Sequence, residues 1–177
     1  YYQGEWASRY VSLNWQAGLA SKDYGANTFY SAKYPNQYEE TRRYLASLSG
    51  DIHGLPAGII VSPTVYWHRD YDHYQLMRGE EGAKKGENYH RMDVYGASIN
   101  AYMTWALGKT AIGADVRREH IISTAYGDLM AENDWKDIHG SDRKYDHEAS
   151  RTNTSIFLEH NVILDQWTFS AGLLADR

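Results

Sequence analysis

The sequence contains no cysteine, only three prolines and no long hydrophobic run. The lack of cysteine excludes a disulfide framework, a thiolate zinc site and a cysteine nucleophile. No stretch of about 18 apolar residues occurs, which excludes a transmembrane helix. It does not exclude a transmembrane barrel, whose strands show only alternating segments of about ten residues. With 18 Lys and Arg against 23 Asp and Glu, the chain also lacks the basic excess expected of a nucleic-acid-binding protein.

Phenylalanine is scarce too, since 3 Phe stand beside 16 Tyr and 6 Trp. Tyrosine and tryptophan carry a polar group on an apolar ring, so they favour interfaces over a dry core. The aromatic composition therefore indicates an interface.

Residues 95–117 show the clearest pattern in the chain. In the stretch 95–105 the apolar residues Tyr95, Ile99 and Met103 alternate with small or polar ones, and a second alternation follows the short turn "LGKT". Two runs of period 2 joined by a short turn predict a β-hairpin.

Seven such alternating segments are expected to be strands, and no segment has convincing helical spacing. They cover approximately residues 11–19, 38–49, 59–68, 95–105, 112–117, 152–159 and 167–173. Pro63 falls inside the third segment, where it removes a ladder donor, so we expect a bulge there. The connections alternate in length: those near 50–56, 106–110 and 161–165 are short, and those near 20–37, 69–91 and 120–149 are long and polar. This asymmetry is typical of up-and-down barrels of the outer-membrane type.

Three observations predict that the apolar face meets lipid and the polar face an aqueous lumen. First, all seven lysines are assigned to loops or turns, whereas a soluble sheet places lysine on its wet face: Lys22, Lys33, Lys84, Lys85, Lys109, Lys136 and Lys144. Second, aromatic residues form two girdles on the apolar faces, at the long-loop end (Trp15, Tyr44, Trp67, Tyr95) and beside the short turns (Trp105, Trp167). Third, residues 95–105 at a tilt near 45° cover roughly 26 Å, close to the height of a barrel's apolar band.

We therefore expect Ile99, Met103, Val116, Ile156 and Phe169 on the convex side and Asn100, Arg117 and Ser155 on the concave side.

Four stretches, 24–50, 71–79, 88–124 and 151–177, resemble the barrel of TonB-dependent outer-membrane receptors. They include "YDHYQLMRG" and "NYHRMDVYGASINAYMTWALGKT", and the likeness is to the cobalamin-transporter-like branch of Bacteroidetes. The resemblance implies a 22-stranded barrel with an N-terminal plug domain, ligand binding at outer loops, and energy supplied through TonB. It covers nearly the whole chain but includes neither plug nor TonB box.

We therefore expect an all-β fold: an antiparallel up-and-down transmembrane β-barrel, present here as an incomplete sheet of about seven strands spanning residues 1–177. The predicted function is that of a transporter and not an enzyme, importing a scarce nutrient such as cobalamin or a metal–siderophore chelate across a Gram-negative outer membrane. The implied partners are outer-membrane lipid, the plug domain, the TonB complex, the nutrient and a surface lipoprotein, with no nucleic acid and no cofactor. Two alternatives remain open, a soluble lectin-like antiparallel β module and a passive porin-type barrel.

The expected ligand contacts lie in the outer loops, because loops on a rigid barrel carry binding. They are Tyr24, Asn27, Tyr30, Tyr34, Asp72 and Tyr74.

Other constellations favour structural roles. His68, Asp70, Asp72 and His73 match no metal-binding spacing, and the acidic stretch 126–148 does not match a calcium loop. Asp115, Arg117, Glu119 and Glu159 are expected to form ion pairs across strands rather than a catalytic carboxylate pair.

Overall fold

The computed structural model describes residues 1–80 and 86–177, and its regular structure is almost entirely β. Long strands dominate, with two short 3₁₀ turns, η1 (Pro56–Gly58) and η3 (Glu132–Asp134). The strands are β1 (Tyr2–Ala7), β2 (Val11–Asn27), β3 (Gln37–Ile52), β4 (Ile60–Gln75), β5 (Glu87–Trp105), β6 (Gly108–Ser123), β7 (Asp128–Leu129), β8 (Lys136–Asp137), β9 (Lys144–Tyr145), β10 (His147–Ile163) and β11 (Thr168–Asp176). Within the described part of the chain, no helix has the length and apolar character needed to cross a membrane.

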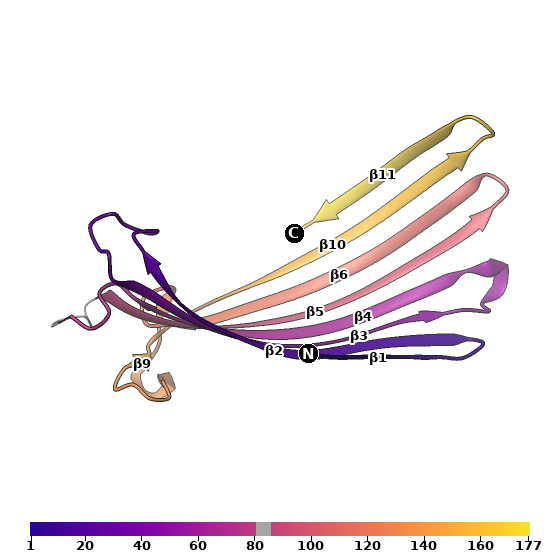
Figure 1. The fold of residues 1–177 in the computed structure, drawn as a ribbon. Helices are drawn as coiled ribbons and strands as arrows, with labels where there is room; N and C mark the ends of the chain where they lie inside the picture. Colours follow the sequence, from indigo (N-terminus) through magenta and orange to yellow (C-terminus); the bar gives the residue numbers. More distant parts are fainter. Residues whose placement is uncertain (81–85) are drawn as a thin grey trace.

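The strands form one large antiparallel sheet in which neighbours follow chain order. The order is β1-β2-β3-β4-β5-β6-β10-β11, with β7 attached to β10, and β8 and β9 form a separate two-stranded ribbon. Figure 1 shows a curved, open sheet with β1 and β11 at its two edges. The expected antiparallel up-and-down topology is therefore confirmed, and the sheet is not closed into a barrel.

Two sequence-based details are wrong. The count of seven misses two strands of the sheet. One is the two-residue β7, and the other is β1, whose central Gly4 lies beneath the ring of Trp15 and interrupts the apolar pattern. The bulge expected at Pro63 is absent, because the register of β3 and β4 is the same on both sides of it: Ser49 faces Thr64 and Ile52 faces Val61. The irregularity lies instead between Gly25 and Asn27, at the end of β2.

The long strands continue well beyond the apolar alternation. β5 begins at Glu87, eight residues before Tyr95, which adds about 26 Å of strand. The three long connections therefore shrink to residues 28–36, 76–86 and 124–146. Ion pairs between neighbouring strands support these extensions in place of apolar contacts, as in Arg43–Asp70 and Arg69–Asp93.

This extension also corrects the lysine assignment. Lys22 lies inside β2 and Lys109 near the start of β6, and Lys136 and Lys144 lie in β8 and β9. Lys33 lies in the connection after β2, and Lys84 and Lys85 lie outside the described residues. Lysine is thus excluded from the apolar stretches but not from strands, because the strands extend past those stretches.

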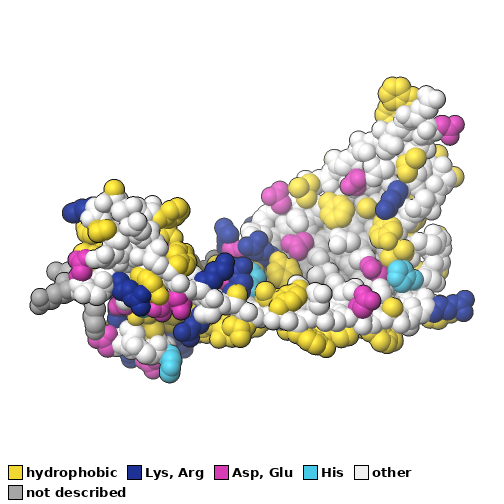
Figure 2. All heavy atoms as spheres, viewed as in Figure 1, with side chains coloured by type: hydrophobic (Ala, Val, Ile, Leu, Met, Phe, Trp, Pro, Cys, Tyr) yellow, Lys and Arg dark blue, Asp and Glu magenta, His cyan; other side chains and the backbone are white. Residues whose placement is uncertain are grey.

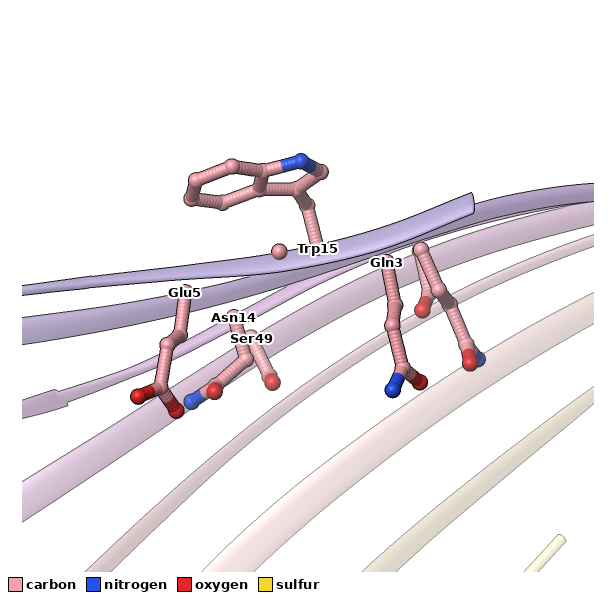
Figure 3. A pocket seen from close by; sticks show the side chains of 8 residues that line it. Gln3, Glu5, Asn14, Trp15 and Ser49 are labelled. Carbon is pink, nitrogen blue, oxygen red and sulfur yellow. The ribbon is translucent and has the colours of Figure 1, made fainter. Parts of the chain in front are cut away.

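The sheet separates its side chains into an apolar convex face and a polar concave face. Figure 3 shows Trp15 on one side and Gln3, Glu5, Asn14 and Ser49 on the other, the side on which the later strands lie. Register places Leu48, Val65, Ala97 and Val116 in one row with Trp15, whereas Ser49, Thr64, Ser98, Asp115 and Ser155 share a row with Asn14. Figure 2 agrees, with hydrophobic side chains along the lower, convex edge and charged ones scattered in the hollow.

Among residues 1–80 and 86–177, no layer covers the convex apolar face over the half of the sheet near the short turns. Ile99 is 54% exposed, Val65 51%, Ile112 51% and Ile156 55%. The small core lies at the opposite, long-loop end, where residues 130–145 fold against the convex face. It contains Ile122, Met130, Ile138 and Tyr145, with Tyr89 and Trp135 packed against them.

Candidate binding site

The polar cluster around Glu39 is the candidate binding site on the concave face. Register places Tyr24 of β2 and Tyr74 of β4 directly beside Glu39 of β3. Tyr30 comes from the 28–36 loop and donates a hydrogen bond of 2.7 Å to Glu39 Oε2. The rings of Tyr30 and Tyr74 meet edge to face with their centroids 5.3 Å apart. Three phenols from three segments thus surround one carboxylate.

Electrostatics couples Asp72 to this cluster. Burial, reinforced by the negative charge of Glu39, raises the pKa of Asp72 to about 6. The Asp72 Oδ1 atom is buried and has no hydrogen-bond partner among the described residues. The hydrogen bond to Glu39 raises the phenol pKa values of Tyr24 and Tyr30, so both hydroxyls stay protonated and act as donors at neutral pH. Burial, followed by the charge of Glu39, raises the pKa of Tyr74.

Gln37 holds the loop that carries Tyr30. Its side chain is 2% exposed, and its Nε2 donates to the backbone oxygens of Ser31 and Tyr34, each at 2.8 Å. Its Oε1 accepts from the backbone N–H of Tyr30 at 3.1 Å. These three bonds replace backbone pairing that a strand would supply, and they fix the loop on the concave side of the sheet (Figure 1).

The structure brings four of the six predicted contact residues together. Tyr24, Tyr30, Asp72 and Tyr74 converge near Glu39, whereas Asn27 pairs with Gln37 at the end of β2 and Tyr34 contributes its backbone to Gln37. Their assignment to loops is wrong for Tyr24, Asn27, Asp72 and Tyr74, which lie on strands. Glu39 and Gln37 were missed, although period 2 places Glu39 on the same face as Ser47 and Ser49.

A polar groove of about 420 Å³ runs from this cluster along the same face. Lys22, Thr41, Arg43 and Asp70 line it together with Glu39 and Asp72. It offers both donors and acceptors to a polar ligand. A second trough, of about 520 Å³, lies between β1, β2 and β3 and is lined mainly by amide and hydroxyl side chains (Figure 3).

The His and Asp residues of β4 do not converge as metal ligands would. His68 Nδ1 contacts Asp70 at 2.8 Å on the concave face, whereas His73 points to the convex face, stacks on Tyr89 and contacts Glu87. Across residues 1–80 and 86–177, no group of three or more His, Asp and Glu side chains could hold a metal ion. Strand alternation explains the separation, because Asp72 and His73 are successive residues.

Three carboxylates of the acidic stretch 126–148 contact basic side chains. Asp137 lies 3.5 Å from Lys144, Asp146 contacts His147, and Glu148 contacts His120.

Glu119 is likewise held in an ion pair on each side. Arg117 of the same strand and Arg151 of β10 both contact its carboxylate. The expected ion pairing across strands is therefore confirmed at Glu119, through Arg151, whereas Arg117 pairs within β6 and Glu159 accepts a hydrogen bond from Asn161.

No family model matches this chain, and comparisons with curated proteins and with solved structures find no match either.

Proposed function

We propose that this chain forms part of the barrel wall of a TonB-dependent receptor in a Gram-negative outer membrane. The observation that carries the proposal is the uncovered apolar band on the convex face, opposite a polar concave face. A continuous exposed apolar surface that extends over several strands marks contact with lipid or another protein. Alternation over several long antiparallel strands, with short turns at one end and long loops at the other, favours lipid.

On this proposal, further strands pair with the open edges β1 and β11 to close the barrel. A plug domain fills the lumen and couples the receptor to TonB. The imported nutrient, such as cobalamin or a metal–siderophore chelate, contacts the concave face near Glu39, and a surface lipoprotein covers the long loops. The rim beyond the apolar band would then stand above the membrane, where Tyr24, Tyr30 and Tyr74 are available for stacking and hydrogen bonding.

Two arginine substitutions at adjacent positions test the proposal. Ala101 lies on the convex face between Val61 and Ile112, and Asn100 lies on the concave face between Ser62 and Gly113. In the complete receptor, Ala101→Arg should destabilise the barrel by about 2–4 kcal/mol, the cost of a cation near the membrane midplane. Asn100→Arg places the same charge in the aqueous lumen and should cost much less.

Reversible denaturant titrations of both variants in lipid vesicles provide the measurement. Both changes add one positive charge at adjacent positions of the same strand. The effects of net charge and of position along the chain are therefore nearly equal in the two variants and cancel in the comparison. Equal losses, or a larger loss for Asn100→Arg, would contradict the lipid-facing assignment and favour a soluble β module.

A further inference from the structure

A separate hollow, also of about 520 Å³, lies on the convex face at the long-loop end. It is on the opposite side of the sheet from Glu39 and from the two troughs described above. Strands β3, β4 and β5 form its floor, and the β8–β9 segment forms its wall. Figure 1 shows that segment on the convex side of the sheet. The volume lies within the range of small-molecule sites.

The wall of this hollow is fixed before any ligand arrives. Ile138 and Tyr145 of the wall are buried against Ile122 of the sheet. Arg143 donates a hydrogen bond to the backbone oxygen of Glu87, which ties the segment to β5. A preformed wall spares a ligand the entropic cost of ordering a loop.

Aromatic rings line the floor in several orientations. Tyr44 and Tyr71 meet edge to face with their centroids 6.2 Å apart, and Tyr89 stacks on His73 at 4.1 Å. Trp67 lies beside them and carries the guanidinium of Arg69 over its ring. Such rings bind apolar ligand faces while their hydroxyl and indole groups stay polar.

The charged groups at the hollow balance one another. Arg69 and Arg91 share Asp93, at 2.6 Å and 3.5 Å, and Glu40 contacts His73. Arg42 is exposed and makes no ion pair in the described part of the chain, and the Arg91 Nε atom is buried without a hydrogen-bond partner there. With two of three guanidiniums compensated, the site does not select an anion; it offers closely spaced donors and acceptors.

We propose that this hollow binds a neutral sugar ring, as a free saccharide or as a unit of a glycan. A sugar presents an apolar C–H face that matches the aromatic floor, and hydroxyl groups that both donate and accept. Carboxylates such as Glu40 and Asp137 accept from these hydroxyls, and Arg42 and Arg91 donate to them. The proposal does not depend on nutrient import, because the site lies on the other face of the sheet.

Isothermal titration of the full-length protein with glucose, galactose, mannose and N-acetylglucosamine tests this proposal. An amine-oxide detergent is required, since the sugar headgroup of a maltoside would itself occupy the hollow. At least one neutral sugar should bind. Tyr44→Leu and Arg42→Gln should each lower the affinity for that sugar by about tenfold or more. Addition of a maltoside should compete.

Two matched variants on the same face provide controls. Tyr95→Leu and Arg118→Gln change exposed residues of the convex face that do not line the hollow, so sugar affinity should stay unchanged. Circular dichroism of all four variants establishes that they fold. No binding by any of the four neutral sugars, or equal losses of affinity in the control variants, would each overturn the proposal.

Discussion

Glu39 and Asp72 show how register creates a site at the residue scale. Tyr24, Glu39 and Tyr74 are separated by 15 and 35 positions in sequence, yet they lie side by side on three neighbouring strands. The aromatic character of this region could be predicted from the sequence, because tyrosines recur through residues 24–38. The central carboxylate could not, since its position depends on a pairing register that no local pattern specifies.

Replacing Asp72 by Asn should change how stability depends on pH. The folded-state pKa of about 6 lies above the ordinary value of 3.8, so between these values the folded chain holds a proton that the unfolded chain has released. Stability contributed by Asp72 is therefore present below about pH 4 and lost as pH rises to about 6. At about pH 7.5 the Asp72→Asn variant should be more stable than the wild type by up to about 3 kcal/mol, a difference that vanishes near pH 4.

Urea titrations in lipid vesicles across this pH range measure the effect. Asp128→Asn, which changes an exposed carboxylate in β7, serves as the control and should leave the pH profile unchanged. A difference between Asp72→Asn and the wild type that stays constant from pH 4 to 7.5 would contradict the assignment of the proton to Asp72.

At the scale of single elements, the β5–β6 hairpin depends on the glycine that ends its turn. Residues 106 and 107 connect Trp105 to Gly108, which has a φ of +125°. A Cβ at Gly108 would lie 1.9 Å from the backbone oxygen of Asn161 in β10. Gly108→Ala should therefore destabilise the protein by about 3 kcal/mol, through backbone strain and displacement of the neighbouring strand.

Gly140 separates these two causes. Its φ is +81°, but no atom of the described residues lies within 4 Å of the place that an added methyl group would take, so Gly140→Ala should cost only about 1 kcal/mol. Chemical denaturation of both variants gives the comparison. Similar losses would mean that the contact with Asn161 does not constrain the turn.

The elements divide into those that the sequence predicts and those that it does not. Apolar alternation in 95–105 locates the part of β5 that ends at the short turn, because one face of that stretch is uniformly apolar. The extension through residues 87–94 is not visible in hydropathy, since ion pairs and rings hold it, as in Arg69–Asp93 and His73–Tyr89. In β2, β4 and β5, the sequence pattern therefore locates the half of the strand beside the short turn and misses the extension toward the long loop.

At the scale of the whole molecule, two tryptophans lie in different environments. Trp105 lies beside a short turn on the apolar face, whereas Trp135 packs in the core at the other end and donates to the Met130 backbone oxygen. In vesicles with brominated acyl chains, a protein that retains only Trp105 should be quenched most by bromine near the headgroups. A protein that retains only Trp135 should not be quenched, because that ring lies beyond the lipid.

Fluorescence of the two single-tryptophan proteins, with the other five tryptophans replaced by Phe, provides the measurement. Vesicles of the same lipid without bromine give the reference intensity. Equal quenching of Trp105 and Trp135 would contradict the proposed membrane position. This outcome does not depend on whether the convex hollow binds a sugar.

Apart from the two-residue strand β7, the segment between β6 and β10 leaves the sheet at Ser123 and returns at His147, and these two residues are direct neighbours in the register. The excursion therefore begins and ends at one place, and the alignment of β6 with β10 does not depend on what lies between. Lengthening a flexible excursion costs little, about 0.6 kcal/mol for each doubling. Natural variation can thus exchange this outer segment for a shorter or longer one while the sheet beneath stays the same. The outer segment and the sheet that carries it are therefore free to diverge at different rates.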